Sequence, residues 1–185
     1  MSSPHLRQVD DDAIRQAWGT IAENATGLDE AVAGESVTAL NDHLSGLYIL
    51  FNQLRKHRWL VDGAETGDVE DALGAAADRL TETTDELARR VVELGGVPVC
   101  GPMGVREHAH LFVEPPHSYD LRSSLERDRV AYETLAVQVR EHVRAATDRG
   151  DTTTSSLLRR HLLTLETDAH TLARYLADDT LVRAE

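Results

Sequence analysis

Aromatic residues, proline and cysteine are all scarce in this sequence. Aromatics make up 4% of its 185 residues and proline occurs only 5 times, whereas Ala, Leu, Glu, Asp and Arg are abundant. This balance favours helices over sheet, because most of the abundant residue types have high helix propensity. The length suits one domain with a full hydrophobic core. The composition therefore predicts an all-α fold.

Cys100 is the single cysteine, which excludes an intramolecular disulfide and fits a reducing compartment. No base or helix terminus is evident beside it, so we expect an inert thiol in a loop. No apolar run approaches the length of a membrane span, and the N-terminal residues lack the apolar core of a signal peptide. These absences predict a cytoplasmic protein that does not insert into a membrane.

Lysine is nearly absent, since Lys56 is the only one, and the formal net charge is −13. An acidic, lysine-poor surface is typical of proteins kept soluble in very high salt, and a genomic preference for arginine codons gives the same composition. The negative charge also opposes nonspecific DNA binding, which needs clustered Lys and Arg to neutralise phosphates. No basic tail is visible, so nucleic acid is not an expected partner.

Four long segments carry apolar residues at the spacing of amphipathic helices. The predicted helices cover residues 35–61, 68–94, 120–149 and, after an N-cap at Asp151, 152–176. The connection between the second and third helices, residues 95–119, is too long for a hairpin turn and fits a crossover that holds a short helix. Two helical hairpins joined by a long crossover predict a ferritin-like four-helix bundle.

Residues 1–34 are expected to form an N-terminal extension that is partly helical or disordered. A short amphipathic helix is predicted after the acidic run at residues 10–12, and glycines are expected to end it before the bundle begins. The apolar residues of this helix and the glycines that follow are Ile14, Trp18, Ile21, Gly27 and Gly34.

Two groups of residues outside the main stripe could bind a metal in principle. The crossover histidines lie in a flexible loop without nearby cysteine, so we do not expect them to form a metal site. Glu166 and His170 lie one helical turn apart but lack the Glu-x-x-His spacing of larger ferritins, and we expect a surface or intersubunit role. The crossover histidines are His108, His110 and His117.

The apolar stripe of the first helix ends on a cation. Its steps of three and four residues pass through Leu47, Phe51 and Leu54, and the next step falls on Arg58. An unpaired charge removed from water is strongly destabilising, so the guanidinium needs a partner. The identity of that partner is the main functional question.

The run at residues 47–63, which includes Lys-His-Arg-Trp and ends in Val-Asp-Gly, resembles the Dps family of mini-ferritins, in particular its acidic archaeal members. Asp-Glu-Leu-Ala-Arg-Arg at residues 85–90 and Leu-Gly-Gly-Val-Pro at residues 94–98 carry the same resemblance, as does the tail at residues 168–182. The similarity covers residues 35–182, which we take as the Dps domain.

The resemblance implies a ferritin-like subunit, twelve of which form a hollow cage for iron storage and protection against oxidative stress. It also implies an iron-oxidising site at each two-fold subunit interface. In the family, one helix supplies a histidine directly before the tryptophan and a second histidine twelve positions later. The neighbouring subunit supplies an aspartate and, four residues on, a glutamate.

Only one of these family ligands is present in this chain. The two histidines correspond to Arg58 and Glu70, the glutamate to Arg89, and a further acidic position to Gly74, whereas the aspartate is kept as Asp85. Two imidazoles and two carboxylates would leave two negative charges for a divalent cation, but here two guanidinium groups cancel two carboxylates. Guanidinium cannot deprotonate to become a ligand. Asp85 and Glu70 are the residual metal candidates.

We therefore hypothesise that Arg58 and Arg89 pair with Glu70 and Asp85 across the two-fold, so that an ion-pair network replaces the metal bridge. The simpler alternative is that Asp85 and Arg89 pair within their own helix. His57 points about 100° away from the ligand direction and cannot replace the lost imidazole. We expect it at an interface or in solvent, with Trp59 at the subunit interface.

The leading prediction is a Dps-like cage subunit with a degenerate ferroxidase site, without enzymatic activity and without a required cofactor, although iron can be its cargo. The cage is expected to be a dodecamer, either of this chain alone or mixed with an active homologue. The alternative is an active mini-ferritin, a ferroxidase-type oxidoreductase that oxidises Fe²⁺ with peroxide or oxygen through altered ligands. The third and weakest hypothesis is a DNA-compacting stress protein.

Overall fold

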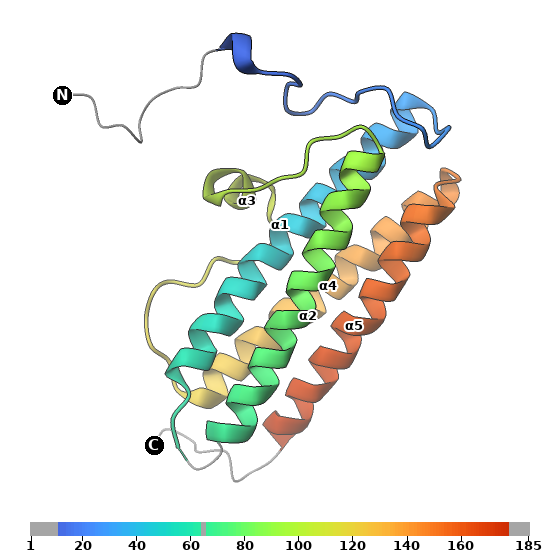
Figure 1. Ribbon diagram of the computed structural model, residues 1–185. Coiled ribbons are helices and arrows are strands. Elements are labelled where there is room, and N and C mark those ends of the chain that lie inside the picture. The colour runs from blue at the N-terminus through green and yellow to red at the C-terminus, as the bar shows by residue number, and fades with distance from the viewer. Residues whose placement is uncertain (1–10, 64–65, 178–185) are drawn as a thin grey trace, which may run out of the picture.

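The structure is a computed structural model that describes residues 11–63 and 66–177 (Figure 1). Four long helices form a bundle, and a short helix lies in the connection between the second and third of them. After a 3-10 turn η2 (Asp11–Ala13), the helices are α1 (Glu30–Leu60), α2 (Thr66–Glu93), α3 (Pro102–His108), α4 (Leu121–Asp148) and α5 (Thr152–Ala177).

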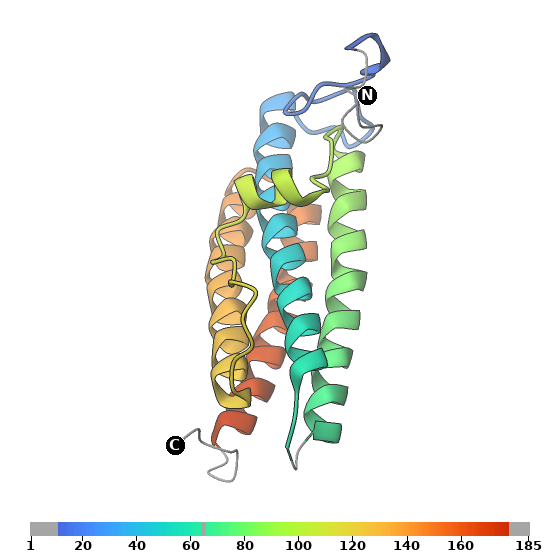
Figure 2. The same cartoon turned by 90° about the vertical axis from the view of Figure 1, so that its left-hand side faces the viewer.

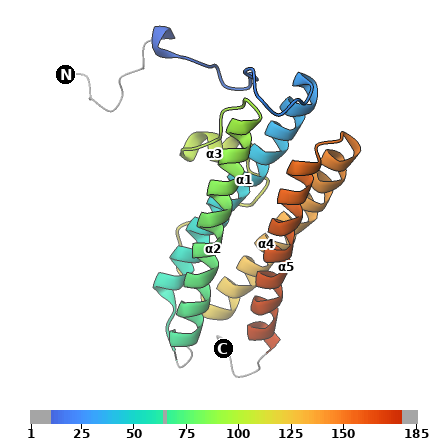
Figure 3. The ribbon, with the colours of Figure 1, turned by 45° about the vertical axis from the view of Figure 1, so that its right-hand side comes forward.

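The helices are arranged as two antiparallel hairpins, α1 with α2 and α4 with α5, as Figure 3 shows. The crossover between the hairpins runs along the side of the bundle and includes α3 (Figure 2). This arrangement confirms the predicted four long helices and long crossover. Within the described residues, no helix combines the length and apolarity needed to cross a membrane.

The apolar stripes read from the sequence form the core. Leu40, Leu44, Leu47 and Leu54 of α1 are fully buried, and Tyr132 of α4 is the largest of the fully buried side chains. The polar residues predicted to begin the third and fourth helices do cap them. Asp120 accepts a hydrogen bond from the Ser123 amide (2.9 Å), and Asp151 accepts one from the Thr154 amide (3.0 Å).

The N-terminal segment differs from its prediction. The expected amphipathic helix at Ile14, Trp18 and Ile21 is wrong, because residues 14–29 form turns and irregular chain. Gly19 adopts φ +80°, which a right-handed helix does not allow. The segment crosses the end of the bundle, where the Ala22 amide donates to the Gly95 carbonyl at 2.8 Å (Figure 1).

The beginning of α1 also differs from its prediction. The sequence predicts that the first long helix begins at residue 35, after Gly34, but α1 starts at Glu30 and continues through this glycine. A Cβ at Gly34 would lie 3.6 Å from the Ile21 side chain, so the N-terminal segment packs directly over this glycine. Tertiary packing therefore outweighs the low helix propensity of glycine here. At the other end, residues 178–182 of the predicted domain lie outside the described residues.

Candidate functional site

Arg58 lies on the outer side of the α1–α2 hairpin and faces α2. One of its terminal nitrogens is 3.6 Å from a carboxylate oxygen of Glu70, and both side chains are nearly half exposed, at 42% and 46%. Gly74 follows Glu70 by one helical turn. A Cβ built on Gly74 would lie 3.0 Å from the central carbon of the Arg58 guanidinium. The guanidinium therefore lies in the space that a larger side chain at position 74 would need.

Asp85 and Arg89 form a second, separate pair on α2. Their charged atoms are 4.0 Å apart and both side chains are mostly exposed, at 70% and 77%. Asp85 lies fifteen residues after Glu70 on one helix, which corresponds to about 22 Å. One chain therefore does not bring the two pairs together, and a site built from all four residues needs a second copy of the chain.

The donor set of these positions does not suit a transition-metal ion. Two of the four side chains are guanidinium groups, which carry no lone pair for a metal and repel cations. Within residues 11–63 and 66–177 of one chain, no group of three or more His, Cys, Asp or Glu side chains is arranged to hold a metal ion.

The other residues considered as metal ligands are placed apart from this site. In the crossover, His108 and His110 lie 3.9 Å and 3.7 Å from the carboxylate of Asp42 on α1. His117 is exposed and meets the ring of Tyr119 edge-on. On α5, Glu166 pairs with Arg140 at 2.6 Å, whereas His170 is exposed.

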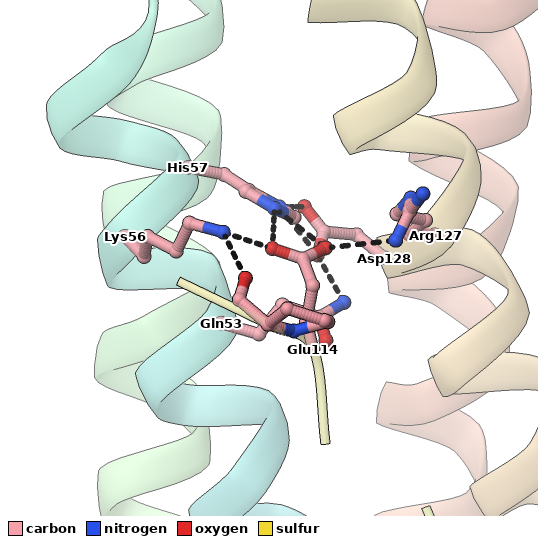
Figure 4. A network of polar contacts seen from close by, with 7 residues as sticks. Gln53, Lys56, His57, Glu114, Arg127 and Asp128 are labelled. Carbon is pink, nitrogen blue, oxygen red and sulfur yellow. Dashed lines mark hydrogen bonds and ion pairs between the residues drawn. The ribbon is translucent and has the colours of Figure 1, made fainter. Parts of the chain in front are cut away.

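His57 is not at an interface or in solvent, contrary to the prediction. The residue is only 2% exposed, because its position on α1 faces the bundle core rather than the outer side where Arg58 lies. Its Nδ1 lies 2.8 Å from one oxygen of Asp128 on α4, and its Nε2 lies 3.2 Å from the carboxylate of Glu114 in the crossover. Figure 4 shows the imidazole held between these two carboxylates.

Three further side chains complete this buried network (Figure 4). The amide of Gln53, one turn before His57, donates to Asp128 at 2.8 Å. Lys56 forms an ion pair with Glu114 and donates to the Pro115 carbonyl at 3.2 Å. Arg127 approaches Glu114 from the other side at 3.7 Å. The network therefore fastens the end of the crossover to α1 and α4.

The charges in the network stabilise one another. Burial alone would lower the pKa of His57, but the hydrogen bonds and charges of Asp128 and Glu114 outweigh it and raise that pKa above its ordinary value. Burial opposes ionisation of Glu114 as well, yet Lys56 and His57 hold the pKa of its carboxyl below the usual range. Burial raises the pKa of the Asp128 carboxyl, although its hydrogen bonds to His57 and Gln53 act in the opposite direction. The contacts therefore favour a protonated imidazole, and the network serves a structural purpose.

The sequence contains a signal for this network that the apolar periodicity alone does not reveal. Asp128 follows Leu125 by three residues and precedes Tyr132 by four, so it occupies the buried stripe of α4. His57 follows Leu54 by three residues and likewise lies on the buried stripe of α1. An acid and a histidine on two core stripes predict a buried pair, because neither is stable there alone.

Trp59 remains an exposed aromatic residue on the described surface of the single chain. It is 68% exposed, and the guanidinium of Arg55 lies 4.9 Å from the centre of its ring. The same guanidinium lies 5.2 Å from the ring of Phe51. Phe51 itself is half-buried, so Trp59 is the exposed aromatic residue of this group, and its interface role stays a prediction.

Comparison with known proteins gives a consistent result at the level of the family. A family model for the ferritin-like domain matches residues 37–182. The chain is 43% identical over 159 residues to the DNA protection during starvation protein of Halobacterium salinarum, covering 86% of this chain and 87% of that protein. It is 31% identical to a nutrient stress-induced DNA-binding protein of Synechococcus, and the match covers 90% of this chain and 94% of that protein.

Solved structures agree with these sequence matches. An archaeal Dps homologue from Halobacterium salinarum superimposes with a TM-score of 0.87 at 41% identity, covering 92% of this chain and 96% of that chain. DpsC from Streptomyces coelicolor gives a TM-score of 0.88 at 29% identity, and the match covers 92% of this chain and 99% of that chain. The ferritin-like all-α fold expected from the sequence is therefore confirmed, and this chain belongs to the Dps family of the ferritin-like superfamily.

Proposed function

We propose that this chain is a subunit of a Dps-type cage, related to iron storage and protection against oxidative stress, in which ion pairs replace the usual iron-oxidising site between subunits. The observation that carries the proposal is the position of Arg58. Its guanidinium stands where the family places a metal-binding imidazole, and it lies 3.6 Å from Glu70, which replaces the second imidazole.

The substitutions at this position fit one another sterically. Gly74 replaces the further acidic residue of the family, and a side chain there would displace the Arg58 guanidinium from its present position, because its Cβ would lie only 3.0 Å from that group. Removing that side chain makes room for the arginine, and Glu70 supplies its counter-charge. Arg58, Glu70 and Gly74 thus form a matched set, which supports replacement of the site rather than loss of one ligand.

Electrostatics lead to the same proposal. The family set carries two negative charges that Fe²⁺, the substrate, neutralises, whereas Arg58, Glu70, Asp85 and Arg89 sum to zero without iron. Because Asp85 and Glu70 are far apart in one chain, the full set forms only between two copies. In that interface, each guanidinium can bind a carboxylate of its own chain or of the neighbour, and Trp59 lies beside them as an apolar contact.

Iron oxidation tests this proposal. Fe²⁺ is added anaerobically to the purified protein, followed by peroxide or oxygen, and the rate of Fe³⁺ formation is compared with buffer. The unmodified protein is expected to match buffer, because no assembled ligand set remains. The triple variant Arg58→His, Glu70→His, Arg89→Glu is expected to oxidise iron faster. Rapid oxidation by the unmodified protein would instead establish an active ferroxidase with altered ligands.

The composition of the cage is tested separately. We propose a dodecamer of this chain, and native mass spectrometry of the purified protein is expected to show twelve copies. Co-expression with an active homologue tests the mixed assembly, since a mixed cage gives intermediate masses that depend on the ratio of the two chains. A stable monomer or dimer under these conditions contradicts the proposed cage.

DNA binding is not part of this proposal, although two relatives are named for DNA protection or DNA binding. The chain has a net charge of −13 and a single lysine, so its overall charge opposes binding to the phosphates of DNA. A gel shift across a range of salt concentrations is expected to show no retained DNA at physiological salt. Retention there would restore DNA compaction as a function.

A further inference from the structure

Each of the four long helices contributes one titratable side chain to a single layer of the bundle, about 21 Å along α1 from His57. We call this group the histidine layer, and its members are His43 of α1, Glu86 of α2, His142 of α4 and His161 of α5. Its members come from both helical hairpins, α1 with α2 and α4 with α5. His43 is 1% exposed and His161 is 4% exposed, so the centre of the layer is closed to water.

Four of the six ring nitrogens in this layer are buried without a hydrogen-bond partner in the described structure. Both ring nitrogens of His43 are buried without a hydrogen bond, as are Nδ1 of His161 and Nδ1 of His142. The rings of His43 and His161 face each other across the hairpin boundary, with their centres 6.4 Å apart. At His43, a neutral imidazole keeps one unpaired donor and one unpaired acceptor, and an imidazolium would add a charge without a hydrogen-bonded carboxylate.

Charged groups near the layer lie at its edges. Glu86 contacts the outer nitrogen of His161 at 3.0 Å, but it is half exposed and also pairs with Arg160 at 3.3 Å. Asp42 lies on the opposite side and is already near two crossover histidines. The charged and titratable groups that surround the three imidazoles are Asp42, Glu86, His110, Glu141, Arg149 and Arg160.

Burial is the largest cause of a lowered pKa in all three rings. It lowers the pKa of His43 well below the ordinary value, and the neighbouring His161 and His142 lower it further. Burial also lowers the pKa of His142, although Asp42 acts in the opposite direction. For His161, burial outweighs the effect of Glu86 and again lowers the pKa. The three rings therefore resist protonation as a group.

We propose that the histidine layer is an acid-sensitive latch between the two hairpins. Uncharged imidazoles let the hairpins close at neutral pH. When the surroundings become acidic, protons gain access by opening of this layer, and two facing imidazolium ions then repel each other and keep α1 and α5 apart. The other end of the bundle, held by His57 between two carboxylates, stays closed.

The direction of the pH dependence follows from linkage. Unfolded histidines titrate near pH 6.5, whereas the folded layer binds protons only at lower pH. Between these limits the unfolded or opened chain carries more protons than the closed one. Stability contributed by the layer is therefore complete above pH 6.5 and is lost as the pH falls below it.

Thermal unfolding between pH 7.5 and pH 5 tests the latch in the full chain as purified. The unmodified protein is expected to lose several degrees of Tm on acidification. His43→Leu removes the buried imidazole and should lose clearly less. His43→Gln, which keeps a polar side chain that cannot be protonated, should also lose less and covers the case in which His43→Leu does not fold. His170→Gln, at an exposed site on α5, is the matched control and should behave as the unmodified protein does.

Hydrogen exchange at pH 5.5 and pH 7.5, corrected for the intrinsic effect of pH, locates the opening. Residues 38–47 of α1 and 157–165 of α5 are expected to exchange faster at pH 5.5, whereas residues 53–60 should change little. The same loss of Tm in both His43 variants as in the unmodified protein would overturn the proposal. Equal acceleration of exchange at both ends of the bundle would overturn it as well.

Discussion

His57 and Arg58 are neighbours in the chain but belong to two different regions of the molecule. His57 faces the core and is held between Asp128 and Glu114, with almost no exposed surface. Arg58 faces outward and meets Glu70 at 3.6 Å, in a pair that is nearly half exposed. A rotation of about 100° around one helix therefore separates a buried structural network from an open surface position.

This difference in burial indicates which positions of the chain tolerate substitution. Breaking a buried ion pair by removing one partner destabilises a protein by about 3–5 kcal/mol, whereas an exposed pair contributes about 0–1 kcal/mol. Residues at positions 58, 70 and 74 can therefore be replaced at little expense to the subunit. Substitutions in the network around His57 are expected to destabilise the subunit. Exposed metal ligands can therefore be replaced by ion-pairing residues without loss of the fold.

The largest effect is expected at the buried network. Asp128→Ala leaves His57 without its closest carboxylate and should lower the free energy of unfolding by about 3–5 kcal/mol. Glu126→Ala, at an exposed position on the same helix, is the matched control and should change it by less than about 1 kcal/mol. Urea unfolding monitored by circular dichroism measures both. Similar small losses in the two variants would show that His57 and Asp128 do not form a stabilising pair.

The pH dependence of His57 should be opposite in sign to that of the histidine layer. Because folding raises the pKa of His57, its stabilisation is complete below pH 6.5 and is lost as the pH rises through the raised value. The difference in free energy of unfolding between the unmodified protein and His57→Gln is expected to be about 1.5–3 kcal/mol at pH 6 and smaller at pH 9.

Urea unfolding at both pH values provides this measurement. His117→Gln, at an exposed site in the crossover, is the control and should show no such change with pH. A difference between unmodified and His57→Gln protein that grows toward pH 9 contradicts the arrangement of charges described here.

The smallest effect is expected on the exposed side, between Arg58 and Gly74. Gly74→Ala should stabilise the helix by about 0.5–1 kcal/mol when Arg58 is also changed to Ala, because alanine is the better helix former. In the unmodified background the gain should be smaller, because the new methyl group displaces the guanidinium. A double-mutant cycle should therefore show a coupling of about 0.5 kcal/mol. Equal gains in both backgrounds would mean that the two positions do not share space.

The bundle itself was predictable because each long helix carries its own apolar stripe. Leu40, Leu44, Leu47 and Leu54 specify the buried face of α1 without reference to any other element, and the caps at Asp120 and Asp151 lie within a few residues of the groups they bind. Local rules of this kind do not depend on tertiary contacts. They failed at Gly34, which lies within α1 despite the low helix propensity of glycine, beside the side chain of Ile21.

The surroundings of the histidines depend on residues far away in the sequence. The ring nitrogens of His57 contact Glu114 and Asp128, which follow it by 57 and 71 residues. The ring of His43 lies beside the ring of His161, on a helix of the other hairpin. Helical periodicity places each histidine on a buried face. Only the packing of the bundle determines that His57 contacts two carboxylates and that His43 lies beside another imidazole.

Replacement of the iron site between subunits by ion pairs is tested most directly by an anomalous-scattering map. Crystals of the cage are soaked anaerobically in Fe²⁺, and data are collected at the iron absorption edge. We expect no iron peak between Glu70 of one subunit and Asp85 of its neighbour, with the Arg58 and Arg89 side chains ordered there instead. An iron peak at about 2.0–2.3 Å from either carboxylate would contradict the claim.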